Sequence, residues 1–495
     1  MTQFMESFFD KPTTNFKLWS KNVNQINLTE KDIVFKGQML KLSTKTGKLK
    51  DRLFILTSSQ LLYLKSAREP RLRGVMQTEW VRCEYIEEIS ENRKRNCIRF
   101  IKNMKYCDFW VDKETDFKLW KSHLSKVLIQ SDFHGKFNAI KMIGKGSFAR
   151  VYLVEEKETG IKYAVKAFSK ECLLSQAKGR DSLLNEINIM RKLEHPNIMK
   201  LEEIHESKNS VYLILELLEG GELFSHIADK KQISVNDICR IMKCLLEALV
   251  YLSDKGIMHR DLKPENMILD KKGDLGESVL KLVDFGLSTQ CDVPEYLFKR
   301  CGTPGYVAPE VINAASNENV HYSTKCDVFS AGVIFYIMLT GKTPFEGHTF
   351  QEVLAQNRAC KIDFKNQKLR KSAHVLDLVQ KMLENNPNGR ISARDALNHE
   401  FFKVYDLSRG VDYETEEEKL SLNYSQIKKV KNGVNNLEAI DSFVIREGII
   451  NGEINTIDET NSQAGFLSVK TMGRKEENNG RRKKTSILKE HLLKE

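Results

Sequence analysis

The stretch His259-Arg260-Asp261-Leu262-Lys263-Pro264-Glu265-Asn266 is the part of the sequence that decides the fold. It follows a long amphipathic helical pattern, in which apolar residues recur at steps of three and four between Ile238 and Leu252. A strand-like run at 280–283 comes later, and Asp284-Phe285-Gly286 lies directly after it. This order of helix, polar loop, strand and second acid predicts a domain of mixed α and β structure with polar side chains gathered on its loops.

A glycine-rich stretch lies upstream of this region, between two strand-like runs. It reads Ile143-Gly144-Lys145-Gly146-Ser147-Phe148-Ala149-Arg150-Val151. Glycines have no side chain, so their backbone N–H groups can approach phosphate oxygens closely. A simple hairpin turn would carry the same pattern, so the stretch by itself does not distinguish a phosphate-binding loop from a turn.

A strand and a helix come after the glycine-rich stretch, and each carries one charged residue among apolar ones. In the strand, alternation places Ala164 and Lys166 on one face, where a small residue can pack against adenine and an ammonium can reach phosphates. In the helix at 182–193, Glu186 shares a stripe with Leu183, Met190 and Leu193. A buried carboxylate needs a partner, and Lys166 is the candidate; an acid at the edge of the stripe, reaching solvent, is the alternative.

These motifs and Ala308-Pro309-Glu310 occur in one order over about 270 residues, and together they identify the chain as a member of the eukaryotic protein kinases. The resemblance implies an α+β, bilobal catalytic domain at 133–402, with a smaller lobe at about 133–218 and a larger lobe at about 219–402. It also implies a serine/threonine enzyme, because Lys263 and Thr303 are typical of that class.

The resemblance assigns a role to each matching residue. The residues expected to bind ATP are Ile143, Gly144, Lys145, Gly146, Ser147, Val151, Ala164, Lys166, Glu186, Glu216, Leu218 and Glu222. The residues expected to act in catalysis are Asp261, Lys263, Asn266, Asp284 and Thr303. Among these, Asp261 would accept the hydroxyl proton, and Asn266 and Asp284 would bind Mg²⁺. An ion pair between Glu310 and Arg390 would close the larger lobe.

Two stretches, 218–224 and 390–399, are similar to the calcium/calmodulin-dependent kinase group. In that group, acids matching Glu222 and Glu265 bind an arginine three residues before the phosphoacceptor, which bidentate pairing makes reasonable. The resemblance therefore predicts a basophilic enzyme; alternatively, Glu222 binds only the ribose. The usual phosphoacceptor position of the activation loop is Lys299, so activation by phosphorylation there is not expected.

A second domain is predicted at 33–130 from its strand patterns, its terminal helix and its charge. These residues hold 21 Lys+Arg against 11 Asp+Glu, which is +10 of the net +11 of the whole chain. Several strand-like runs precede a helix at 114–128, which places Phe117, Trp120, Leu124 and Val127 on one stripe. This pattern resembles a pleckstrin homology domain, a small β-barrel or sandwich capped by a C-terminal helix.

In such domains the first hairpin can bind phosphoinositide head groups, and Lys41, Lys50 and Arg52 match the pattern that does so. Alternation puts Lys50 and Arg52 on the same side, where both can meet phosphate. The charge balance also favours an anionic partner. The alternatives are a domain that binds protein, or a basic surface that serves only solubility.

The two ends of the chain carry weaker patterns. Residues 1–32 are expected to form a poorly ordered arm, and 403–495 a regulatory or disordered tail. The segment 419–440 resembles the calmodulin-binding segment of related kinases, or is a solvated linker. The sequence has no EF-hand loop for calcium, no signal peptide and no long apolar run, and nucleic acid is not an expected partner.

Together these patterns predict a cytoplasmic protein serine/threonine kinase that uses ATP and Mg²⁺, acts on protein substrates and associates peripherally with membranes. The alternative from another class is a pseudokinase scaffold positioned at a membrane. Intact Lys166, Asp261, Asn266 and Asp284 argue against the scaffold, because these residues would carry the chemistry.

Overall fold

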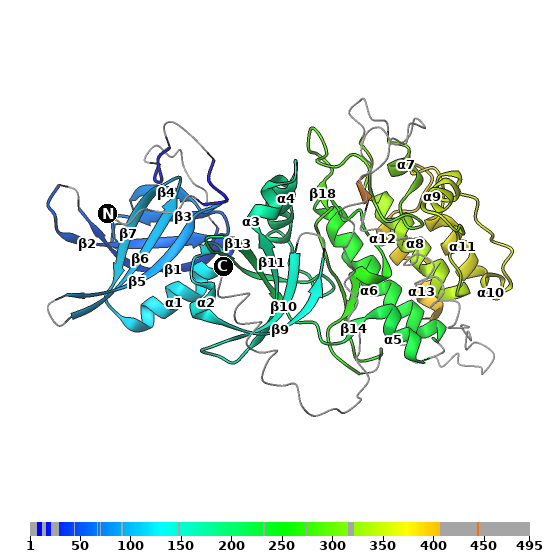
Figure 1. The fold of residues 1–495 in the computed structure, drawn as a ribbon, viewed down its shortest axis with the longest axis horizontal. Coiled ribbons are helices and arrows are strands. Elements are labelled where there is room, and N and C mark those ends of the chain that lie inside the picture. The colour runs from blue at the N-terminus through cyan, green and yellow to red at the C-terminus, as the bar shows by residue number, and fades with distance from the viewer. Residues whose placement is uncertain are drawn as a thin grey trace.

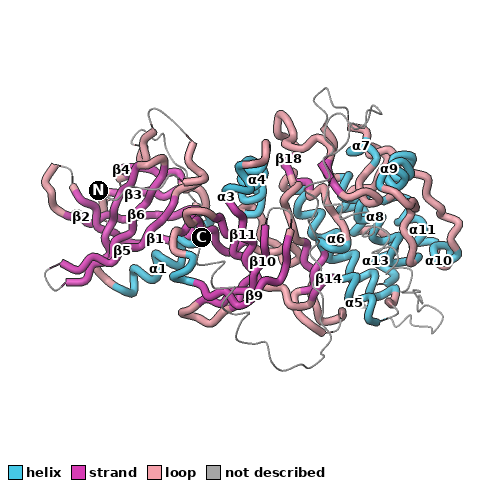
Figure 2. Tube along the Cα trace, in the orientation of Figure 1, coloured by secondary structure: helices cyan, strands magenta, loops and turns pink. Residues whose placement is uncertain are grey.

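The computed structural model confirms a mixed α and β fold with an amino-terminal unit, a smaller lobe and a larger lobe in a row (Figure 1). Strands gather in the first two bodies, and helices in the third (Figure 2). The structure describes residues 7–11, 16–20, 29–43, 45–66, 68–69, 71–90, 93–146, 149–230, 233–273, 275–314, 321–405 and 443–444.

The amino-terminal unit is a curved antiparallel sheet covered by one helix. Its elements are β1 (Ile33–Leu42), β2 (Leu49–Thr57), β3 (Gln60–Leu64), β4 (Leu72–Gln77), β5 (Arg82–Ser90), β6 (Arg93–Lys102), β7 (Lys105–Val111) and α1 (Glu114–Ser125), preceded by the 3₁₀ turn η1 (Glu30–Asp32). β1 pairs with both β2 and β7. The indole of Trp120 on α1 is fully buried against Phe35 and Phe54, and its Nε1–H donates to the Gln38 carbonyl at 3.3 Å.

The smaller lobe is a sheet accompanied by three helices. Its elements are α2 (Phe133–Lys136), β9 (Phe137–Lys145), β10 (Ala149–Glu156), β11 (Lys162–Ser169), α3 (Lys170–Leu174), α4 (Gly179–Met190), β12 (Leu201–Glu206) and β13 (Ser210–Glu216). β11 lies between β10 and β13, which places Lys166 in the middle of the sheet.

The larger lobe packs helices around α8, which is buried from Cys326 to Thr340. Its helices are α5 (Leu223–Lys230), α6 (Val235–Asp254), η2 (Pro264–Asn266), α7 (Pro309–Ile312), α8 (Lys325–Thr340), α9 (Phe350–Ala359), α10 (Gln367–Arg370), α11 (Ala373–Met382), α12 (Ala393–Leu397) and α13 (Glu400–Tyr405). Its strands are β14 (Gly221–Glu222), β15 (Ile257–Met258), β16 (Met267–Leu269), β17 (Leu280–Leu282), β18 (Thr289–Gln290) and β19 (Cys301–Gly302), and the separate strand β20 (Phe443–Val444) pairs with β19. Short strands and loops therefore form the side of this lobe that faces the smaller one.

A two-residue strand, β8 (Ile129–Gln130), joins the first two bodies. It runs parallel to β5 on one side and to β12 on the other, and Ile129 N–H donates to the Val81 carbonyl at 3.0 Å. The strands of the amino-terminal unit and of the smaller lobe thus belong to a single sheet of 13 strands. Because Ile129 is fully buried in the hydrophobic cluster of the kinase lobes, this junction is part of the folded core.

The prediction of a poorly ordered arm at 1–32 is wrong for residues 7–11 and 16–20. Phe8 and Phe9 are buried against the smaller lobe, and Trp19 packs edge-on against aromatic rings of the amino-terminal unit. The polar composition around these aromatic residues hid the contacts, because each contact needs a surface that forms only after the neighbouring body has folded.

The described residues contain no helix long and apolar enough to cross a membrane. The carboxy-terminal segment 419–440, for which the sequence suggests a regulatory role, lies outside the residues that the structure describes.

Because Ile129 is buried in the β8 junction, we expect a charge at this position to disrupt the junction. Ile129→Asp places an unpaired carboxylate in a dry site, which is disfavoured by several kcal/mol, so we expect the two bodies to separate there. In Ile129→Asp, limited proteolysis should cut the segment 126–137 at least tenfold faster than in the parent. Mass spectrometry of the fragments would show this. Ile129→Val is the matched control and should keep the parental rate; equal protection of both variants would contradict a shared sheet.

Candidate active site

The glycine-rich stretch forms the turn of the β9–β10 hairpin. Gly144 pairs with Val151 across the hairpin, and Gly146 N–H donates to the Ala149 carbonyl at 2.8 Å. A Cβ added to Gly146 would approach only the Ala149 carbonyl oxygen, at 3.6 Å, so the space beside this backbone is open. Ser147 lies outside the described residues.

The strand register brings the predicted nucleotide-facing side chains to one face of the sheet. Val151 on β10 lies directly opposite Lys166 on β11, and Ala164 is two residues along the same strand. Half-buried Ile143 on β9 packs against the main hydrophobic cluster, whereas Lys145 is exposed. The face therefore combines a small apolar surface, suited to an adenine ring, with one half-buried ammonium.

Three charged groups meet behind this face. Lys166 Nζ lies 2.8 Å from Glu186 Oε1 on α4 and 3.1 Å from Asp284 Oδ1, which comes after β17. Burial by itself lowers the pKa of Lys166, but the charges of Asp284 and Glu186 outweigh it and raise the pKa above its ordinary value. The same ammonium lowers the pKa of Asp284 to about 2 against the effect of burial, so this carboxylate is ionised at neutral pH.

The connection between the lobes is held by the side chain of Glu216 at the end of β13. Its carboxylate accepts hydrogen bonds from Lys281 Nζ at 2.9 Å and from the Lys200 N–H at 2.6 Å. Leu218 lies further along the connection and is half-buried. The Glu216 carboxylate is used to fix the connection. The expected contact of Glu216 with adenine would therefore be made by its main chain.

The catalytic loop collects the remaining predicted residues around Asp261. Thr303 Oγ1 donates to Asp261 Oδ1 at 2.7 Å, and Lys263 Nζ lies 3.0 Å from Asp261 Oδ2. Asn266 Nδ2 donates to the Asp261 carbonyl at 2.8 Å, which ties the end of the loop to its start. Side chains from two segments, the loop and the region of strand β19, therefore converge on one acidic residue.

Asp327, at the start of α8, holds the backbone of this loop. Its carboxylate accepts the His259 N–H at 2.7 Å and the Arg260 N–H at 2.9 Å. Arg260 has φ of 67° and Asp284 has φ of 63°, a left-handed conformation that non-glycine residues adopt at a cost. The buried carboxylate thus stabilises a strained turn that presents Asp261.

The guanidinium of Arg260 is satisfied without a phosphate. Nε donates to the Leu287 carbonyl at 2.7 Å, and Nη1 donates to the Phe298 carbonyl at 2.6 Å and to the Tyr322 hydroxyl at 2.8 Å. Lys299 pairs with Glu295 at 3.1 Å. Sequence reasoning missed Tyr322, which has no motif of its own and meets Arg260 only through the fold.

The two acids proposed to recognise a substrate arginine come from adjoining elements. Glu222 on β14 is buried and accepts from Ser225 Oγ at 3.4 Å. Glu265 on the 3₁₀ turn η2 is half-buried, and β14 packs directly against this turn. Burial, reinforced by the charge of Glu265, raises the pKa of Tyr306. A cationic side chain at this edge of the site would therefore meet a negative environment.

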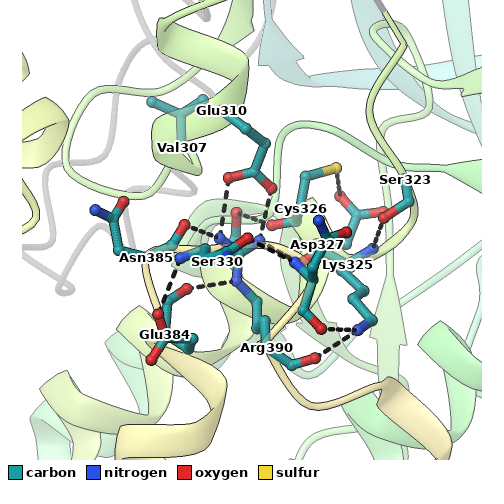
Figure 3. Close-up of polar contacts among 12 residues, drawn as sticks. Val307, Glu310, Ser323, Lys325, Cys326, Asp327, Ser330, Glu384, Asn385 and Arg390 are labelled. Carbon is teal, nitrogen blue, oxygen red and sulfur yellow. Dashed lines mark hydrogen bonds and ion pairs between the residues drawn. The ribbon is translucent and has the colours of Figure 1, made fainter.

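The pair expected between Glu310 and Arg390 is present and has two hydrogen bonds, from Nη1 to Oε1 at 2.6 Å and from Nη2 to Oε2 at 2.9 Å (Figure 3). The fully buried guanidinium also donates to the carbonyls of Glu384, Lys325 and Asn385. The guanidinium thus meets oxygen atoms along its edge and lies 5.0 Å from the centre of the Phe329 ring, and its pair with Glu310 fixes α7 to the end of the domain.

The proposed lipid-binding residues lie together on the amino-terminal unit. Lys41 on β1 is directly opposite Lys50 on β2, and Arg52 lies two residues further along the same face. Lys41 Nζ is 4.1 Å from the centre of the Tyr63 ring and 5.5 Å from that of Trp19, and Arg52 donates to the Lys65 carbonyl at 3.0 Å. Lys50 is exposed.

The donor set suits a metal that is held jointly with phosphates. The described residues contain no cluster of three or more His, Cys, Asp and Glu residues able to hold a metal by themselves. Asp284 supplies an ionised carboxylate and Asn266 an amide oxygen, and Mg²⁺ typically takes one or two such ligands together with substrate phosphates and water. The residues present therefore fit a metal that arrives with a nucleotide.

The fold and this arrangement define a protein kinase catalytic domain. The protein kinase domain family matches residues 137–402, and the PH domain family matches residues 33–128. The chain therefore belongs to the protein kinase family and carries an amino-terminal pleckstrin homology domain. Both resemblances predicted from the sequence are confirmed.

Similar curated proteins support the predicted group. Calcium-dependent protein kinase 4 of Plasmodium falciparum is 39% identical over 273 residues, 55% of this chain and 50% of that protein. Calcium-dependent protein kinase 4 of Plasmodium berghei is 35% identical over 329 residues, 66% of this chain and 59% of that protein. A probable myosin light chain kinase of Dictyostelium discoideum is 40% identical over 266 residues, 54% of this chain and 82% of that protein. The chain thus spans little more than half the length of the two Plasmodium kinases.

We expect a large loss of stability when the buried ion pair between Arg390 and Glu310 is broken. Glu310→Gln leaves the buried guanidinium without its counter-charge, and we expect the free energy of unfolding to fall by about 3–5 kcal/mol. Asp254→Asn is the matched control, because Asp254 also pairs bidentately with an arginine, Arg394, but their side chains are 59% and 60% exposed. It should leave the urea midpoint close to that of the parent, because water screens an exposed pair. Urea unfolding of both variants checks this; equal losses would contradict it.

Proposed function

We propose that this protein is an ATP-dependent protein serine/threonine kinase of basophilic specificity, regulated through its amino-terminal domain. The observation that carries the proposal is the convergence of Lys263, Thr303 and Asn266 on Asp261, beside the ion network of Lys166, Glu186 and Asp284. The first group is suited to a substrate hydroxyl, and the second to the phosphates of a nucleotide.

The chain's own residues divide the reaction between them. Asp261 accepts the proton of the attacking hydroxyl, and the hydrogen bond from Thr303 orients this carboxylate. Lys263, held 3.0 Å from Asp261, donates to the transferring phosphoryl group, and Lys166 orients the α- and β-phosphates. Asn266 and Asp284 would hold Mg²⁺, which neutralises charge on the phosphates when bound. The bond broken is that between the γ-phosphorus and the bridging oxygen, and ADP leaves with that oxygen.

Basophilic specificity is supported by the placement of Glu222 and Glu265 on adjoining elements. Two carboxylates at one edge of the site favour a guanidinium, whose planar donors match carboxylate oxygens bidentately. The family resemblance places this arginine three residues before the phosphoacceptor.

The first test is phosphorylation of paired peptides, with and without arginine at this position, by the intact protein and by Asp284→Asn. We expect transfer to need the arginine and to fall by at least about 10²-fold in Asp284→Asn, because that variant loses the anion that meets the metal. Incorporation of labelled phosphate measures both effects.

Glu222→Gln and Glu265→Gln refine the same test. Each should raise KM for the arginine peptide by about 10–100-fold, since a charge-assisted bond is lost, and should leave the peptide without arginine unaffected. Absence of transfer by the parent, with vesicles and calmodulin each supplied, would instead support the pseudokinase scaffold. Calmodulin is included because segment 419–440 is its proposed binding site.

Phosphoinositide binding is proposed for the face that carries Lys41, Lys50 and Arg52, and with it peripheral association of a cytoplasmic protein with membranes. Lys50 is the exposed member and lies opposite Lys41, so an anionic head group there would meet two cations. Trp19 and Tyr63 lie against Lys41, which leaves Lys50 and Arg52 as the residues to test.

Lys50→Ala/Arg52→Ala should weaken binding of the intact protein to phosphoinositide vesicles by about 30-fold, because each of the two cations contributes about 1 kcal/mol near an anionic leaflet. Co-sedimentation with vesicles that contain or lack the phosphoinositide measures this. Lys157→Ala, an exposed lysine of the smaller lobe, is the control for charge alone. Equal binding by parent and double variant would remove this face as the lipid site.

A further inference from the structure

Residues 7–10, here called the arm segment, lie where the amino-terminal unit meets the smaller lobe. Phe9 is 1% exposed and Phe8 is 7% exposed, and both belong to the hydrophobic cluster that contains Leu183 and Ile187 of α4. Phe9 also stacks on Trp80 of the amino-terminal unit, with ring centres 5.0 Å apart and planes within 5°. The arm segment is thus shared between two bodies.

The groove that receives the arm segment contains a carboxylate directed at its backbone. Glu206, at the end of β12, has a fully buried side chain that accepts from Ser7 Oγ at 2.6 Å and from the Phe8 N–H at 2.6 Å. Its third donor is Lys170 Nζ on α3, at 2.7 Å. Two of these three donors come from the arm segment, so the groove is complete only when the segment is bound.

The arm segment contacts the start of α4, and Trp80, on which Phe9 stacks, lies against the residue after its end. Near the start of the helix, Arg180 Nε donates to the Phe8 carbonyl at 3.0 Å and Nη2 to the Asp10 carbonyl at 2.7 Å. Just after its end, the Arg191 guanidinium lies 5.4 Å from the centre of the Trp80 ring on which Phe9 stacks.

The position of α4 decides whether the active site is assembled. It carries Glu186, which pairs with Lys166, and Asn185, whose Nδ2 donates to the Ser288 carbonyl of the activation segment at 2.7 Å. A shift of the helix away from β11 would break both contacts and leave the half-buried ammonium of Lys166 with Asp284 alone. Anything that binds α4 in its present position therefore favours phosphoryl transfer.

We propose that the arm segment is an internal activating element, in which Phe8 and Phe9 are positioning residues that hold α4 where Glu186 meets Lys166. The groove formed by α3, α4, β12 and Trp80 is its docking site, and the occupant is the chain's own amino terminus. This inference rests on the proposed kinase activity and identifies how that activity is maintained when the activation loop has Lys299 at the usual phosphate position.

The test uses full-length variants in the peptide phosphorylation assay. Phe8→Ala/Phe9→Ala removes the aromatic anchors, and Arg180→Ala removes the two bonds to the arm carbonyls while leaving the hydrophobic residues unchanged. We expect both to lower kcat at least tenfold and to change KM for ATP less than threefold. A synthetic peptide of residues 4–14 should restore kcat of the double variant saturably, and the same peptide with both phenylalanines replaced by alanine should not.

Lys11→Ala, the exposed neighbour of the arm segment, is the matched control and should keep parental kcat. Parental kcat in both Phe8→Ala/Phe9→Ala and Arg180→Ala would overturn the proposal. So would a loss that the peptide cannot restore, because the substitutions would then act on folding rather than through the groove. Failure of the parent itself to phosphorylate the peptide would count against the proposed function, which keeps the two outcomes separate.

Discussion

The ion network of Lys166, Glu186 and Asp284 is the interaction on which the active site depends. Its three members come from β11, from α4 and from the segment after β17, which belong to both lobes. A buried charge is tolerated only when it is paired, so each of these segments must be in place for the other two to be stable there. One ion network therefore couples the closure of the lobes to the position of a single helix.

In the larger lobe, Asp327 has the corresponding role for the catalytic loop. By accepting two consecutive backbone N–H groups it stabilises the left-handed conformation of Arg260 and turns Asp261 towards the substrate side. Arg260 in turn binds the activation segment through carbonyls and the Tyr322 hydroxyl. Arg260 thus holds the activation segment through neutral carbonyl oxygens and without a phosphate group.

The elements around α4 belong to the amino-terminal domain as well as to the kinase lobe. Strand β8 joins their sheets, and Trp80 receives both Phe9 of the arm and Arg191 after α4. Residues 16–20 of the same arm lie on the face that carries Lys41, where Trp19 meets Tyr63. Residues 7–10, which contact the helix that carries Glu186, and residues 16–20, which lie on the face that carries Lys41, thus both come from the stretch before β1.

From the sequence alone, the periods of strand and helix determined the Trp120-bearing helix, because a period is a property of neighbouring residues. The order of the motifs determined the resemblance to protein kinases, and that resemblance implied the two lobes and the grouping of Lys166, Asp261, Asn266 and Asp284. Only the tertiary structure decided that β8 unites two sheets, that Tyr322 satisfies Arg260, and that Glu206 binds the backbone of residue 8. These contacts join residues far apart in the sequence, and they form between surfaces that exist only once each body has folded. A short aromatic pair in a polar arm carries no local period, so its destination could not be predicted from its neighbours.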